Sequence, residues 1–144
     1  MKKQAFRILA VLSLLLTMSA AIVNAQSKRS TINIPFSFTV GQKTLPAGEY
    51  TVEPNRKDSP NVWLIQSKSG HGSVLFTTSS VWTTETQEKT RLVFNSYDGQ
   101  YFLSQIWTSG DNSGRKLQIP RRARELAKSG IQPEKVVVTR GAGE

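Results

Sequence analysis

The chain has 144 residues, of which nineteen are basic, ten are acidic and none is cysteine. The absence of cysteine excludes disulfide bridges, thiolate metal sites and a lipid-modified amino-terminal cysteine. The formal net charge of +9 indicates a basic protein that attracts anionic partners.

Residues 1–25 have the pattern of a cleaved export signal. Three basic residues precede an apolar stretch over residues 8–23, and small residues end at Ala25, where cleavage before Gln26 is predicted. The alternative is an uncleaved membrane anchor, but polar residues interrupt the stretch, which is already shorter than the roughly 20 apolar residues of a span. We therefore predict export to the periplasm or to the outside of the cell, with no transmembrane segment after cleavage.

The part that remains after cleavage has the size of one domain. Three basic residues and no acidic residue leave with the signal, so the net charge stays at +6 over 119 residues. A chain of this length buries roughly two-thirds of its unfolded surface. We predict a single β-rich domain over residues 26–140 and a disordered tail over residues 141–144.

The clearest secondary-structure pattern is an alternation of apolar and polar residues over residues 31–40. The apolar positions form one buried face of a strand, and they are Ile32, Ile34, Phe36, Phe38 and Val40. Pro35 cannot donate a ladder hydrogen bond, which predicts a sheet edge or a bulge. Gly41 ends the strand, and residues 45–48 have turn chemistry. We expect a hairpin with Tyr50 and Val52 as the next inward-facing pair.

Further strands are predicted at intervals of about a dozen residues. They cover residues 62–66, 73–78, 91–95, 101–108 and 136–138. Asp98-Gly99 is a strong hairpin signal between two of them. This spacing predicts a mainly β fold, either an antiparallel sandwich or a small barrel of about 7–8 short strands.

One short helix interrupts this pattern near the carboxyl end. Pro120 precedes good helix formers over residues 121–128, and Gly130 suits the position after a helix end. Its apolar stripe, made of Ala123, Leu126 and Ala127, is narrow but long enough to lie against a sheet or across a barrel mouth.

Residues typical of catalysis are scarce. His71 is the only histidine and lies in a Gly-flanked turn, the ten acidic residues are scattered, and no Gly-x-Ser-x-Gly motif is present. We predict no catalytic residue, no metal site and no cofactor. A hydrolase of envelope material remains an alternative, because folding can bring two distant carboxylates together.

Two groups of residues are candidates for binding. The first is a basic group near the helix: Arg115, Lys116, Arg121, Arg122, Arg124 and Lys128. On a helix, Arg121, Arg124 and Lys128 fall on one side and form a compact positive patch, which suits an anionic envelope polymer or a lipid surface. The alternative is a solvated helix face. Export removes the usual nucleic-acid partner, so nucleic acid is not expected.

The second candidate is Trp82, which stands among serines and threonines with little to bury it. An exposed tryptophan suits a sugar ring or a small apolar ligand. The other two tryptophans, Trp63 and Trp107, lie within predicted strands, and core positions are expected for them.

Three blocks of sequence resemble a family of small exported bacterial β-rich proteins of uncharacterised function. The first runs from Ile34-Pro35-Phe36-Ser37-Phe38 to Leu45-Pro46-Ala47-Gly48-Glu49-Tyr50, the second from Leu92-Val93-Phe94 to Ile106-Trp107, and the third is the basic segment over residues 114–128. The resemblance implies a signal peptide and one β-rich domain, and it transfers no functional residue.

The sequence leads to three functional hypotheses. The first is an exported, non-enzymatic β-domain that binds a ligand or an envelope partner. The second is the carboxylate-dependent hydrolase. The third is a structural protein of the envelope that associates through a sheet edge, at Pro35 or near Val136.

Overall fold

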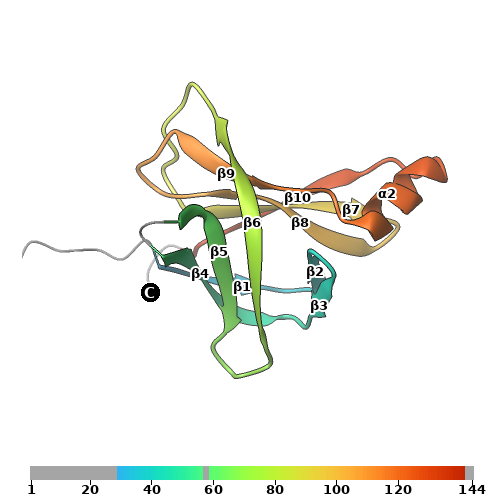
Figure 1. Ribbon diagram of the computed structural model, residues 1–144, viewed down its shortest axis with the longest axis horizontal. Helices are drawn as coiled ribbons and strands as arrows, with labels where there is room; N and C mark the ends of the chain where they lie inside the picture. The colour runs from blue at the N-terminus through green and yellow to red at the C-terminus, as the bar shows by residue number, and fades with distance from the viewer. Residues whose placement is uncertain (1–28, 57–58, 142–144) are drawn as a thin grey trace, which may run out of the picture.

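The computed structural model describes residues 29–56 and 59–141, which form ten strands and one short helix (Figure 1). The predicted mainly β fold with a helix near the carboxyl end is confirmed. The export signal over residues 1–25 and most of the predicted tail lie outside the described residues. The elements are β1 (Ser30–Ile34), β2 (Phe38–Val40), β3 (Lys43–Leu45), β4 (Gly48–Arg56), β5 (Ser59–Ser67), β6 (Ser73–Trp82), β7 (Arg91–Tyr97), β8 (Gln100–Trp107), β9 (Ser113–Leu117), α2 (Arg121–Lys128) and β10 (Glu134–Thr139).

The strands form one strongly bent, mixed sheet that is not closed. One edge of β8 pairs with β7, which pairs with β10, and the other edge of β8 is shared between β9 and β2. From β9 the sheet continues through β6, β5 and β4 to β1, whereas β2 pairs with β3. β1 and β10 approach each other without pairing. Among the described strands, β2 and β8 form the one parallel pair. The sheet is therefore mixed, whereas the sequence predicts an antiparallel arrangement.

The first four strands form one long hairpin that bends at Pro35. β1 pairs with β4 up to Ile34 opposite Gly48, and β2 pairs with β3 from Phe38 opposite Leu45. Three residues of one arm therefore face two of the other, which is the extra residue of a bulge. The bulge predicted at Pro35 is confirmed. The tight turn, however, lies at Gly41, where φ is 60°, and not over residues 45–48.

The predicted β7–β8 hairpin is also confirmed. Its two turn residues have positive φ, 49° at Asp98 and 75° at Gly99. A turn with two such residues has a twist that matches the flanking strands. One face of this hairpin lines the main core, and its other face packs against the helix.

The main core lies on the inner face of the bent sheet. Edge-to-face ring pairs join Phe94 to Phe36 and Phe38, with centroids 5.1 and 5.5 Å apart. Phe38 makes a further edge-to-face pair with Tyr50. The alternation predicted for residues 31–40 is confirmed, because its apolar residues are buried except for Phe36, which is partly buried.

Helix α2 packs on the outer face of the β7–β8 hairpin. Ala123 and Leu126 are buried against Tyr97 and Phe102. The helix has the predicted bounds, but Ala127, the third residue of the predicted stripe, is exposed. Phe102 faces the helix while the adjacent Leu103 belongs to the main core, so both faces of β8 are covered.

Because of Tyr50, the stability of the domain is expected to depend on pH in the alkaline range. Its phenol is buried and donates a hydrogen bond of 2.6 Å to the Pro46 carbonyl oxygen, and burial raises the pKa of Tyr50 above its ordinary value. The unfolded chain loses this proton near pH ~10. The neutral phenol therefore contributes its full stability below that pH, and the contribution is lost as pH rises through the folded-state pKa.

We expect Tyr50→Phe to cost about 1 kcal/mol at neutral pH, the value of one hydrogen bond. Urea unfolding at a series of pH values from 7 to 11 measures this difference. Above pH ~10 the gap between the two proteins should narrow, because only the wild type loses the contribution of a buried neutral phenol. A gap that is constant over this range would contradict the prediction.

Candidate functional site

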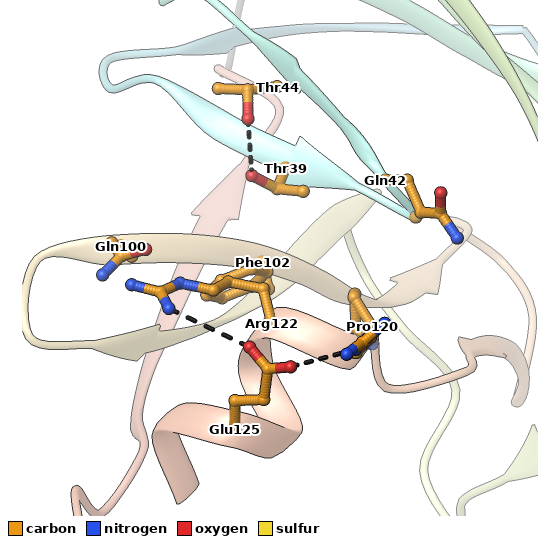
Figure 2. A pocket seen from close by; sticks show the side chains of 10 residues that line it. Thr39, Gln42, Thr44, Gln100, Phe102, Pro120, Arg122 and Glu125 are labelled. Atoms are coloured by element: carbon orange, nitrogen blue, oxygen red, sulfur yellow. Dashed lines mark hydrogen bonds and ion pairs between the residues drawn. The ribbon is translucent and has the colours of Figure 1, made fainter. Parts of the chain in front are cut away.

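An open cleft lies between α2 and the β2–β3 hairpin, with a volume of about 460 Å³ (Figure 2). Volumes in this range are typical of sites for small ligands. The cleft is lined by Thr39, Gly41, Gln42, Thr44, Gln100, Phe102, Pro120, Arg121, Arg122 and Glu125. The parallel pairing of β2 with β8 places the hairpin beside the helix, since Thr39 lies opposite Phe102.

Charged side chains lie on one wall of the cleft and neutral polar ones on the other. Glu125 pairs with two arginines, Arg121 Nε at 3.0 Å and Arg122 Nη1 at 4.0 Å, and Figure 2 shows the pair with Arg122. On the hairpin, the hydroxyls of Thr39 and Thr44 are hydrogen-bonded to each other at 3.0 Å. The cleft therefore presents hydroxyl and amide groups beside two guanidinium groups that share one carboxylate.

The solvent-facing side of α2 is more strongly positive than the cleft. The helix carries four basic residues and one acidic residue, and no acidic residue lies in its first turn. Arg124 and Lys128 are exposed and, among the described residues, have no carboxylate partner. The patch predicted from Arg121, Arg124 and Lys128 lies opposite the buried Ala123 and Leu126, as the helical spacing requires.

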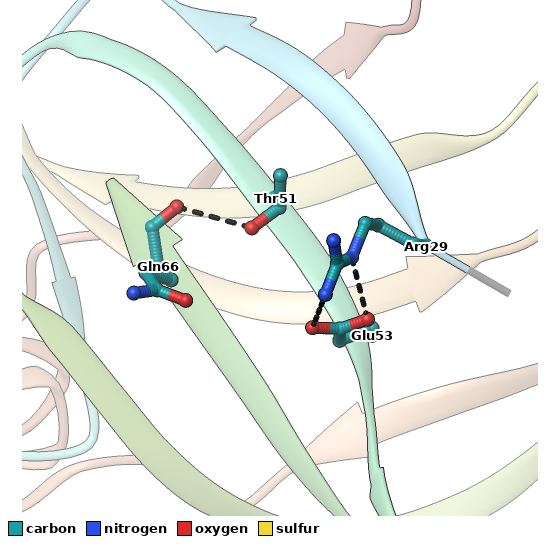
Figure 3. A network of polar contacts seen from close by, with 4 residues as sticks. All are labelled: Arg29, Thr51, Glu53 and Gln66. Carbon is teal, nitrogen blue, oxygen red and sulfur yellow. Dashed lines mark hydrogen bonds and ion pairs between the residues drawn. The ribbon is translucent and has the colours of Figure 1, made fainter. Parts of the chain in front are cut away.

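Two other basic residues, Arg29 and Lys68, are paired with close carboxylates. Figure 3 shows Arg29, just before β1, forming a bidentate pair with Glu53 of β4 at 2.8 and 2.9 Å. The hydrogen bond and charge of Glu53 raise the pKa of Arg29 above its ordinary value. Lys68 lies 3.5 Å from Glu49. Compared with these pairs, Arg124 and Lys128 are more available to an anionic partner.

The structure divides the six predicted basic residues between two elements. Arg115 and Lys116 lie on β9 and the other four on α2. Arg115 Nη1 donates hydrogen bonds to Ser80 Oγ at 2.9 Å and to Asn61 Oδ1 at 3.4 Å. Lys116 is exposed on the opposite face of β9, because side chains alternate along a strand. Adjacency in the sequence therefore does not make these six residues one surface.

Trp82 is exposed, as predicted. Its exposed fraction is 70%, whereas Trp63 and Trp107 are 4% and 5% exposed. Trp63 belongs to the main core, and Trp107 packs against Gly114 of β9. Trp82 is the last residue of β6, where the strand extends past the core.

A second groove, of about 370 Å³, lies beside β6. It is lined by Gly41, Val62, Leu75, Phe76, Thr77, Leu117 and Gln118. None of these residues is charged, and Leu75 is 58% exposed. This lining suits an apolar ligand better than a charged one.

Groups suited to catalysis do not gather in the cleft. Glu125 is the single carboxylate in its lining, whereas a glycoside hydrolase of the usual type needs two. His71 is exposed in the β5–β6 turn. Within residues 29–56 and 59–141, no three histidine or acidic side chains are grouped to hold a metal ion, and no helix is long and apolar enough to cross a membrane.

Comparisons with protein-family models, with curated proteins and with solved structures found no match to this chain. The resemblance to small exported bacterial proteins therefore stays a prediction.

Proposed function

We propose that the protein is an exported, non-enzymatic β-domain that binds an anionic polymer of the cell envelope through α2 and the adjoining cleft. The observation that carries this proposal is the excess of positive charge on the exposed side of α2. Arg124 and Lys128 are unpaired among the described residues, and Arg121 and Arg122 share one carboxylate. Clustered unpaired cations attract polyanions and release their counterions on binding.

The form of the surface favours a polymer over a lipid bilayer. A helix that binds at a membrane surface inserts large apolar side chains between the lipids. The exposed residues of α2 are charged or, at Ala127, small. Thr39, Thr44 and Gln100 line the cleft beside the helix, and their hydroxyl and amide groups suit hydrogen bonding to a hydrated chain.

Removing three cations from α2 tests the proposal. The variant Arg122→Gln/Arg124→Gln/Lys128→Gln keeps the Arg121–Glu125 pair, and glutamine has a helix propensity close to that of arginine and lysine. With dextran sulfate as the probe, we expect the slope of log K against log salt concentration to fall by about three, roughly one for each lost contact. Binding measured by titration calorimetry from 50 to 200 mM salt gives this slope.

The matched control removes three exposed lysines elsewhere, Lys68→Gln/Lys89→Gln/Lys135→Gln. It has the same net charge as the α2 variant and should bind dextran sulfate almost as the wild type does. Uncharged dextran should not bind to either protein. An equal loss of affinity in the two triple variants would show that net charge, and not α2, controls binding, and would overturn the proposal.

A further inference from the structure

The register of β6 and β9 places Trp82 beside Arg115, although 33 positions separate them in the sequence. Ser80 lies opposite Arg115, and Trp82 lies opposite Ser113, with no irregularity between these pairs. Diagonal neighbours on one face of an antiparallel pair are ~7–8 Å apart, within reach of long side chains. The exposed aromatic residue and one of the basic residues thus lie on the same face.

This face continues the core-lining face of the sheet. Phe76 and Thr78 are buried on β6, and Leu117 is buried on β9. Ser80, Trp82 and Arg115 are an even number of residues away on the same strands, so they point to the same side. The strands extend beyond the core here, and inward-facing positions reach solvent.

Arg115 is held in place but its charge is not neutralised. Nη1 donates to Ser80 Oγ and Asn61 Oδ1, both uncharged acceptors. Among the described residues, Arg115 has no carboxylate within ion-pair distance. The nearby carboxylate of Asp111 already accepts from the backbone N–H and the hydroxyl of Ser113. A positioned guanidinium therefore retains donors for an anionic group of a ligand.

We propose that Trp82 and Arg115 bind a saccharide ring that bears a carboxylate. A sugar ring has an apolar C–H face that packs on a flat indole, and an exposed indole with a polar edge is suited to such contacts. A guanidinium fork binds a carboxylate with two parallel hydrogen bonds. Ser80 and Asn61, which accept hydrogen bonds from Arg115, place a hydroxyl and an amide beside the guanidinium.

This site is independent of the proposed function of α2. It shares no residue with the cleft, and the loop that follows β6 lies far from α2 (Figure 1). A simple polyanion binds through its charge and needs no aromatic surface. The site at Trp82, by contrast, combines an exposed indole with a single positioned cation, Arg115. The ligand class is therefore narrower than that of the α2 surface.

Fluorescence of the purified protein tests the proposal. Trp82 is the exposed tryptophan among three, so its emission reports ligand at this site. The probes are a tetramer of galacturonic acid and the neutral tetramer of galactose. We expect the acidic tetramer to shift the emission to shorter wavelength and to bind about tenfold or more tightly than the neutral one, the difference made by one charge-assisted bidentate contact.

Two variants separate the contributions, with binding measured by calorimetry because one of them removes the fluorophore. Trp82→Ala should abolish binding of both tetramers, and since Trp82 is exposed the far-ultraviolet circular dichroism should not change. Arg115→Lys should weaken the acidic tetramer about tenfold and leave the neutral one unchanged, because lysine keeps the charge but not the fork. The α2 triple variant should bind the acidic tetramer as the wild type does.

Three results would overturn the proposal. Equal affinity for the two tetramers would remove the role of Arg115. Loss of binding in the α2 variant but not in Trp82→Ala would place the acidic ligand on α2. Binding of vesicles of phosphatidylglycerol through Trp82, without binding of the tetramer, would identify a lipid surface as the partner. Failure of the dextran sulfate experiment alone would leave the Trp82 proposal standing, because that experiment tests only α2.

Discussion

Replacing Phe94 with alanine is expected to lower the free energy of unfolding by about 3–5 kcal/mol, the cost of removing a fully buried aromatic ring. Phe94 has no exposed surface. Its ring meets Phe36 and Phe38 edge to face, and such pairs stabilise by about 0.5–1.5 kcal/mol each beyond the buried area. A domain with total stability of about 5–15 kcal/mol loses a large part of it.

The effect is large because the ring of Phe94 packs β7 against the bend between β1 and β2. It lies on β7, while its ring partners lie on β2 and on the segment that joins β1 to β2. Backbone pairing joins β7 to β2 only through β8, so the ring pairs add the direct contacts between β7 and the bend of the first hairpin. Urea unfolding followed by circular dichroism measures the loss.

Two further variants calibrate this prediction. Phe94→Leu keeps most of the volume and should cost about 1–1.5 kcal/mol, which gives a measurable value even if the alanine variant does not fold. Val137→Ala removes a half-exposed side chain from β10 of the same sheet and should cost about 0.5 kcal/mol or less. Equal costs for Phe94→Ala and Val137→Ala would show that the aromatic cluster does not organise the core.

Local signals in the sequence predicted the elements that local physics determines. The alternation over residues 31–40 and the Asp98-Gly99 turn fix which face is buried and where the chain reverses. Pro120 and Gly130 bracket α2, whose bounds agree with the prediction. The helix also keeps its predicted basic side, since the angular spacing of residues on a helix does not depend on the rest of the fold.

The sequence could not predict features that depend on pairing between distant strands. β9 is short, and its residues Ser113–Leu117 include Gly and two cations, so it has weak β propensity and was not predicted. It is a strand because β6 and β8 pair with both of its edges. The parallel β2–β8 contact, which places Thr39 in the cleft beside α2, likewise has no local signal.

The same limitation affected the candidate site. Proximity in the sequence groups Arg115 with the arginines of α2, whereas the polar neighbours of Trp82 make it a separate aromatic candidate. The β6–β9 register instead joins Arg115 to Trp82 and separates it from α2. Exposure of Trp82 was predictable from its polar neighbours, but its charged partner was not.

A methyl group at position 114 is expected to destabilise the protein by about 2–3 kcal/mol, because the core there has no room for it. In Gly114→Ala the new Cβ would lie 2.6, 2.7 and 2.9 Å from the Cε3, Cδ2 and Cζ3 atoms of Trp107. The indole cannot move easily. Its Nε1 donates to Gln105 Oε1 at 3.0 Å, and the Arg91 guanidinium lies 5.7 Å from the ring centroid.

Double-mutant analysis isolates this contact. If the clash with the indole causes the loss, Gly114→Ala should cost much less in a Trp107→Leu background, with a coupling of about 1 kcal/mol or more. Gly141→Ala is the control, because a Cβ there meets no atom within 4 Å, and it should be nearly neutral. The same cost for Gly114→Ala in both backgrounds would contradict the steric explanation.

The Gly114 contact also links stability to the proposed saccharide site. Glycine within a strand marks a place where another group approaches the backbone closely, and here the flat indole of Trp107 lies against β9 at the residue before Arg115. Displacing β9 shifts the guanidinium relative to Ser80 and Trp82. We therefore expect folded Gly114→Ala to bind the galacturonic acid tetramer more weakly, and Gly114→Ala/Trp107→Leu to recover part of that affinity in parallel with its stability.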